Sequence, residues 1–85
     1  MSEVRRSEKV HSSLITIQLG KKGITDGFLE EVRRVLKKRG KVKIKILKSA
    51  RTMPRKEIAE IIAKRTGAKI SKIIGYTIIL EEENR

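Results

Sequence analysis

The segment Gly20-Lys21-Lys22-Gly23 contains the residues best suited to chemistry, and it stands between an alternating apolar stretch and an amphipathic one. Glycine has no Cβ, so it permits a sharp turn and the close approach of another backbone. A helix that starts after such a turn offers free N–H groups and a partial positive charge to an anion. Because Lys21 and Lys22 add two full charges, the segment predicts a binding site for a phosphodiester backbone. A plain turn with solvated lysines is the alternative.

A second feature is a run of positive charge in the middle of the chain. Residues 32–56 include twelve lysines and arginines and no acidic residue. Like charges repel, so a run without counter-ions is unfavourable for stability, and a binding surface explains it better than a solvated face. The expected binding residues combine the glycine segment with part of this run: Gly20, Lys21, Lys22, Gly23, Arg33, Arg34, Lys37, Lys38, Lys41, Lys43 and Lys45.

The whole chain is strongly basic. Its 85 residues include 22 lysines and arginines against 10 acidic residues, a net charge of +12. A surface this positive attracts polyanions, of which nucleic acid is the expected one. A thermophilic source would also suit the sparse amide side chains and absent cysteine, but thermophile enrichment raises charges of both signs. A membrane surface is the weaker alternative, because a core needs the apolar faces of the basic elements.

Catalytic chemistry has little to work with in this sequence. There is no cysteine, and His11, the single histidine, falls in a polar stretch near the start. No P-loop motif occurs, and the acidic residues fall on predicted exposed faces or at the end. We therefore expect a protein that is not an enzyme and has no metal, cofactor or small-molecule substrate. The short apolar runs predict no membrane span or secretory signal, and thus a cytoplasmic protein.

The aromatic residues suggest how a nucleic acid would be recognised. Phe28 falls on a predicted core face, and Tyr76 is the other ring in the chain. Proteins that stack single-stranded bases use several rings, and an RRM sheet needs its own stacking rings. We therefore expect recognition of phosphates and RNA shape. Tyr76 is expected to pack in the fold, and a lone ring that stacks on a base is the alternative.

The first half of the chain predicts a strand, a helix and a second strand. Ile15, Ile17 and Leu19 alternate with polar residues, as in a half-buried strand from Ser13 that ends at Gly20. A helix then begins at the N-cap Thr25 and ends at Gly40. Its apolar face is formed by Phe28, Leu29, Val32, Val35 and Leu36. Residues 41–48 alternate strictly between lysine and apolar residues up to Ile46, which predicts a strand with one buried and one basic face.

The second half predicts a helix and two short strands. Thr52 or a neighbour caps the helix, Pro54 lies in its first turn, Ile58, Ile61 and Ile62 form its apolar stripe, and Gly67 ends it. Residues 70–74 and 77–80 form two β runs whose register the pattern leaves open. The fold class is α/β: a two-layer sandwich of order β-α-β-α-β-β, with a mixed four-stranded sheet and both helices on one face. Residues 13–81 form one domain between a flexible basic tail, 1–12, and a polar tail, 82–85.

The two ends of the predicted domain resemble the CRM domain family, named for chloroplast RNA splicing and ribosome maturation. The resemblance lies in residues 19–25 with the following helix and residues 41–45, and again in residues 65–68 and 74–80. It implies RNA binding through the GxxG loop and nearby basic surfaces, and a fold similar to the C-terminal domain of translation initiation factor three. It also implies a role with precursors of the large ribosomal subunit. Family members usually have a longer helical segment before the first strand than the residues ahead of Ser13 provide.

We therefore expect a non-catalytic RNA-binding protein that holds ribosomal RNA or large-subunit precursors. The first alternative is a chromatin protein similar to the Alba family, which shares the element order and a Gly-Lys-Lys segment. Such a protein would carry a long basic hairpin arm, and residues 70–80 leave no room for one. The second alternative is a structural protein of the ribosome. Its positive charge would attach it to the ribosome, and the loop would have no role.

Overall fold

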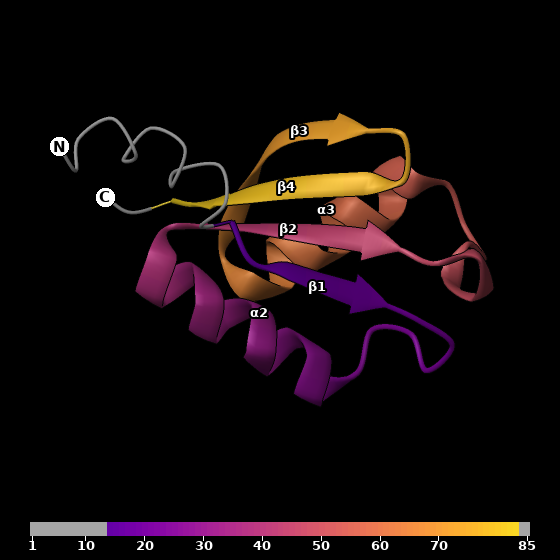
Figure 1. Ribbon diagram of the computed structural model, residues 1–85, viewed down its shortest axis with the longest axis horizontal. Coiled ribbons are helices and arrows are strands. Elements are labelled where there is room, and N and C mark those ends of the chain that lie inside the picture. Colours follow the sequence, from indigo (N-terminus) through magenta and orange to yellow (C-terminus); the bar gives the residue numbers. More distant parts are fainter. Residues whose placement is uncertain (1–13, 84–85) are drawn as a thin grey trace, which may run out of the picture.

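The computed structural model describes residues 14–83 of the chain, so the expected tail of residues 1–12, with His11, lies outside the described residues. The elements follow the predicted β-α-β-α-β-β order, with a short 3₁₀ helix, η1, added after the second strand (Figure 1). Their bounds are β1 Thr16–Leu19, α2 Asp26–Arg39, β2 Lys41–Ile46, η1 Lys48–Ala50, α3 Arg55–Thr66, β3 Ala68–Ile74 and β4 Thr77–Glu82.

The four strands form one mixed sheet in the order β1-β2-β4-β3. β1 pairs parallel to β2, with Leu19 opposite Ile46, and α2 is the crossover between them. β4 lies antiparallel to both β2 and β3. A parallel pair needs such a crossover, and a right-handed one returns the helix to one face of the sheet. The predicted fold class is therefore confirmed.

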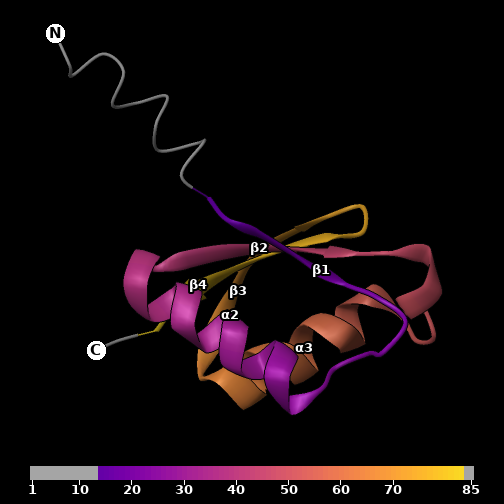
Figure 2. The same cartoon turned by 60° about the horizontal axis from the view of Figure 1, so that its bottom comes forward.

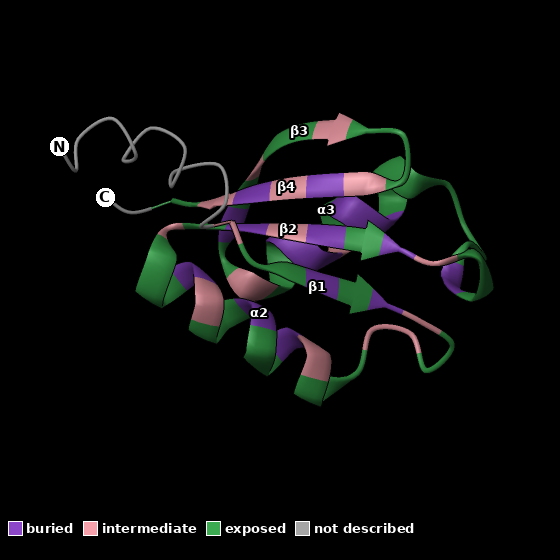
Figure 3. Cartoon of the chain, viewed as in Figure 1, coloured by how far each residue is buried: buried purple, intermediate pink, exposed green. Residues whose placement is uncertain are grey.

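Both helices cover the same face of the sheet (Figure 2). On β2, Val42, Ile44 and Ile46 point into the helix layer and are fully buried, whereas Lys41 and Lys45 are exposed on the other face. The burial colours of Figure 3 alternate along this strand for the same reason. A strand covered on both faces would have been apolar throughout. The sequence therefore specifies the open face of the sheet directly.

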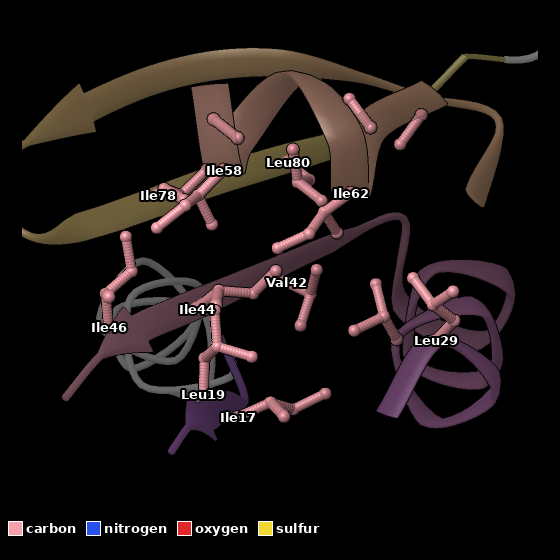
Figure 4. Close-up of a cluster of buried hydrophobic side chains, with 14 of the residues drawn as sticks. Ile17, Leu19, Leu29, Val42, Ile44, Ile46, Ile58, Ile62, Ile78 and Leu80 are labelled. Atoms are coloured by element: carbon pink, nitrogen blue, oxygen red, sulfur yellow. The ribbon is translucent and has the colours of Figure 1, made fainter. Parts of the chain in front are cut away.

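The core lies between the helices and the sheet and consists entirely of aliphatic residues (Figure 4). Leu29, Val32 and Leu36 of α2 meet buried side chains of β1, β2 and β4. On α3, Ile58 and Ile62 are buried as predicted, but Ala59 and Ala63 take the place expected for Ile61, which stays half-buried. No polar or charged residue of the described chain is buried. The core therefore contributes stability alone, and all charges lie at the surface.

The helix ends follow the predicted signals with one exception. The Thr25 hydroxyl accepts a hydrogen bond from the Phe28 N–H at 3.0 Å, and Gly40 and Gly67 end their helices with left-handed φ angles of 83° and 75°. Thr52, however, does not cap α3. Pro54 is the N-cap residue, and no side chain accepts a hydrogen bond there. The Pro54 carbonyl accepts hydrogen bonds from the Glu57 and Ile58 N–H groups, at 2.9 and 3.1 Å, and so begins the helix.

Four strand boundaries differ from the predicted ones, and one of them is the start of β3, which lies at Ala68 rather than at residue 70. β1 begins at Thr16 rather than near Ser13, and β2 ends at Ile46, where η1 follows. β4 continues to Glu82, one residue into the segment predicted as a polar tail, because the Glu82 N–H donates to the Gly40 carbonyl at 2.8 Å. On β3 the register shifts between Ile70 and Lys72, so Ser71 forms a bulge. The bulge lets Ile70 and Ile73 both pack on the core, and explains the imperfect alternation there.

Two isoleucines of the sheet make a matched test of this core. Ile44 is 0% exposed on β2, and Ile74 is 59% exposed at the end of β3. We expect Ile44→Ala to lower the free energy of unfolding by about 3 kcal/mol, because it leaves a cavity in the core. Ile74→Ala should lower it by less than about 0.5 kcal/mol, as is usual for a surface position. Urea denaturation measures both, and equal losses would contradict the one-sided sheet.

Candidate nucleic-acid interface

Three connections meet at one end of the sheet. They are residues 20–25 after β1, residues 47–54 after β2 and the turn of residues 75–76 between β3 and β4, and we call them together the loop end (right-hand side of Figure 1). The Leu47 N–H donates to the Leu19 carbonyl at 2.9 Å, and the Ile46 N–H donates to the Tyr76 carbonyl at 2.8 Å. Both helices also start here. The partial positive charges of two helix N-termini therefore add to the basic side chains of the loop end.

The predicted glycine segment forms a tight turn with both lysines at its tip. The Gly23 N–H donates to the Gly20 carbonyl at 2.9 Å, and Lys21 and Lys22 are exposed. Gly23 has a φ of 75°, which residues with a side chain rarely adopt. Gly20 lies outside that region, and an added Cβ would make only an ordinary contact with Leu47, at 3.6 Å. The turn thus requires glycine at Gly23, whereas its geometry sets no such requirement at Gly20.

A hollow opens between this turn and the start of α2. Gln18, Gly27, Phe28 and Glu31 line it together with the turn. Gly27 lies in the first turn of α2, where a Cβ would meet only the Thr25 hydroxyl, at 3.9 Å. Glycine is unfavourable inside a helix, so its presence without a steric cause is consistent with a surface kept open for a ligand. Glu31 is the acidic residue of the hollow, and Lys21 and Lys22 are its cationic ones.

The three predicted lysines of β2 lie on the open face of the sheet. Lys41 and Lys45 are exposed and Lys43 is half-buried. Lys45 is nearest the loop end, and its neighbour on β1 is Gln18, which lines the hollow. Strand pairing also places two further lysines on this face, because Lys72 pairs with Ile79 beside Lys43, and Lys69 pairs with Glu81 beside Lys41. Sequence reasoning missed both, since their face depends on the bulge at Ser71.

The predicted residues of α2 do not join the loop. Lys37 follows the start of α2 by about 16 Å at 1.5 Å per residue. The Arg33 guanidinium donates to the Arg65 carbonyl at 3.0 Å and lies 4.0 Å from the Glu30 carboxylate, so it links the two helices. Arg34 and Lys38 are exposed on the helix layer, away from the open sheet face. The expected single basic surface is therefore divided among the loop end, the open sheet face and α2.

The absence of counter-ions predicted for the basic run does not hold in three dimensions. Glu81 lies opposite Lys41, and Glu82 and Glu83 line a hollow with Arg33 and Lys37. These acids come from the end of β4, which the antiparallel pairing brings beside the start of β2. These three acids lie at the end of the sheet opposite the loop end, beside Arg33, Lys37 and Lys41.

The sequence and the fold both match known proteins. The family model of the CRS1 / YhbY (CRM) domain matches residues 3–80. The chain belongs to this family. Among its relatives, a probable RNA-binding protein of Methanocaldococcus jannaschii is 37% identical over 73 residues, which cover 85% of this chain and 54% of the relative. The probable RNA-binding protein YqeI of Bacillus subtilis is 26% identical over 77 residues, which cover 91% of this chain and 79% of YqeI.

A solved structure has the same fold as this CRM domain. It is the solution structure of a hypothetical protein from Staphylococcus aureus, with a TM-score of 0.70 and 23% identity over the whole of this chain and 90% of the other. None of these matches supports the Alba alternative. The β3–β4 hairpin also lacks the long arm that the Alba alternative expects, because only Gly75 and Tyr76 separate the two strands.

The CRM domain carries two functional candidates that the sequence analysis placed elsewhere. Tyr76, expected to be packed in the fold, is 40% exposed at the loop end. The Arg51 guanidinium lies 3.7 Å from the centre of its ring. Arg51 belonged to the basic run but not to the predicted site, because the sequence does not show that the β3–β4 turn returns beside η1. Strand order brings these two residues together.

The described residues hold neither a group of three potential metal ligands nor a helix long and apolar enough to cross a membrane.

The two glycines of the turn give a direct test of its geometry. Gly23→Ala should lower the melting temperature by about 4–8 °C, because a side chain at a left-handed φ costs about 1 kcal/mol. Gly20→Ala should change it by less than about 2 °C, since the added methyl meets only ordinary contacts. Thermal unfolding monitored by circular dichroism measures both variants. Equal losses would mean that the fold itself requires Gly20.

Proposed function

We propose that this CRM-domain protein is a non-catalytic RNA-binding protein that holds an RNA backbone at the loop end. The observation that carries the proposal is the Gly20–Gly23 turn, which presents two exposed lysines beside the start of α2. The names of the two relatives, both probable RNA-binding proteins, support RNA as the partner. A catalytic role has no support in those names.

The mechanism rests on charge and close approach. Gly20 and Gly27 have no side chain, so a phosphate can approach the backbone between the turn and the helix. Lys21 and Lys22 pair with neighbouring phosphates from the tip of the turn. The N-terminus of α2, which follows the turn in the chain, contributes its partial positive charge to the same site. Lys45 lies beside Gln18 on the neighbouring strand, and it extends the contact from the hollow onto the open face of the sheet.

We further propose that the RNA is ribosomal, in precursors of the large subunit, and that the protein works in the cytoplasm. The resemblance to the CRM family supports this finer assignment. A protein that binds RNA mainly through phosphates needs a structured target to gain selectivity, because phosphate contacts carry no sequence information. A folded rRNA fragment supplies such a shape, whereas a uniform duplex does not.

The test compares two variants that each remove two positive charges. Lys21→Gln with Lys22→Gln changes the loop end, and Lys64→Gln with Arg65→Gln changes exposed residues at the C-terminal end of α3, at the opposite end of the sheet. About five phosphate contacts would give the unmodified protein a slope of log K against log salt of roughly −3.5 to −4.5. We expect the loop variant to flatten this slope by about 1.4 to 1.8.

The α3 variant should keep the slope of the unmodified protein, because its charges lie away from the bound RNA. Filter binding or fluorescence anisotropy with a structured large-subunit rRNA fragment, at several salt concentrations, measures all three proteins. Circular dichroism confirms that both variants are folded. If the two variants weaken binding equally, the protein acts as a general polycation and the loop has no special role.

A further inference from the structure

A second groove opens at the loop end, beside the turn between β3 and β4. Arg51, Met53, Arg55, Lys56 and Tyr76 are among the residues that line it. Three of these side chains are cationic, and none of the lining residues is acidic. The groove therefore suits an anionic ligand that also presents a flat apolar surface to Met53 and Tyr76.

Tyr76 stands at the edge of this groove with its backbone held in place. Its carbonyl accepts the Ile46 N–H at 2.8 Å, at the end of the pairing between β2 and β4. The residue is 40% exposed, which is more than a ring buried for stability would show. Tyr76 is also the single tyrosine in a chain without tryptophan. A rare aromatic residue on a rigid turn is therefore available to a ligand.

Arg51 makes one side of the Tyr76 ring into a fixed platform. Its guanidinium carbon lies 3.7 Å from the ring centre, and its Nε and Nη2 both donate to the Ile46 carbonyl at 3.3 Å. Arg55 lies 5.5 Å from the same ring centre, within the range of a cation–π contact. The ring and the guanidinium are thus ordered before any ligand arrives. Planar groups of both kinds stack on nucleobases.

We propose that this groove binds one unpaired nucleobase of the RNA held at the Gly20–Gly23 turn, with the base stacked on the Arg51–Tyr76 platform and its phosphate beside Arg55 or Lys56. The inference rests on the proposed function, and it names the substrate class as RNA with an unpaired nucleotide next to the bound backbone. It also revises the expectation that recognition involves phosphates and shape alone.

The position of the groove favours RNA over a peptide. β4 is two strands away from β1, so the strand that leads into the turn and the strand that follows Tyr76 are about 10 Å apart in the sheet. Leu47 and η1 fill the space between the turn and the platform without an acidic residue in residues 47–56. A strand of a few nucleotides can therefore cross the loop end and reach both sites. An acidic peptide would satisfy the charges, but would not explain the planar platform.

The unmodified protein gives the first test, because one tyrosine means one unambiguous set of ring resonances. We titrate it with a hairpin RNA whose stem is closed by a non-nucleotide linker and which carries a short single-stranded extension, and with the same hairpin lacking the extension, in which no base is unpaired. The extended hairpin should shift the Tyr76 ring protons upfield through the ring current of the stacked base. The blunt hairpin should leave them in place. Equal binding of both hairpins without a shift would overturn the proposal and would leave the groove to another partner, such as an acidic peptide.

Two variants at the same position give the second test. Tyr76→Leu should weaken binding of the extended hairpin by about fivefold to thirtyfold and leave the blunt hairpin unaffected. Tyr76→Phe keeps the ring and should keep the affinity for both. Unchanged affinity of Tyr76→Leu for the extended hairpin would also overturn the proposal. A protein that binds neither hairpin would instead overturn the proposed function, so the two failures are distinguishable.

Discussion

The parallel pairing of β1 with β2 is the constraint on which the rest of the structure depends. Because the two strands run in the same direction, α2 must cross between them, and the connections that follow Leu19 and Ile46 leave the sheet at the same end. Both helices begin there for the same reason. The antiparallel hairpin then adds its own turn beside them, with Tyr76 hydrogen-bonded to Ile46. Segments separated by more than fifty residues in the sequence are thus combined in one positive surface, while Glu82 and Glu83 lie at the opposite end.

The fold separates the residues that stabilise it from those available to a ligand. Among the described residues the buried set is entirely aliphatic or alanine, and no buried polar side chain lacks a hydrogen-bond partner. Lys21 and Lys22 are therefore not needed to stabilise the fold, unlike Arg33, which links α2 to α3. The glycines divide in the same way. Gly23 is required because the backbone there has a left-handed φ, whereas the backbone at Gly20 and Gly27 does not require glycine. Substitutions at these positions can therefore alter binding without unfolding the protein. This matters because a small domain with a modest core tolerates little loss of stability.

Local patterns predicted the elements well, but not the surfaces that the elements form. Strict alternation on β2, the Thr25 cap and the left-handed glycines at Gly40 and Gly67 each depend on a few adjacent residues, so the sequence shows them directly. The bulge at Ser71 is different, because it depends on how β3 packs against β4. The basic run looked continuous along the chain, yet the strand and the helix turn its charges in different directions. Likewise, Arg51 and Tyr76 are brought together by strand order, which no local pattern contains.

We propose that RNA binds across the loop end rather than on the open face of the sheet or along α2. The most direct measurement is a map of backbone amide shifts, recorded as a short structured RNA is added to the isotope-labelled protein. We expect the largest shifts in residues 20–23, 48–51 and 75–76, with residues 64–67 at the other end unchanged. Shifts concentrated on Lys41, Lys43 and Lys72, or on the last turn of α2, would contradict the account.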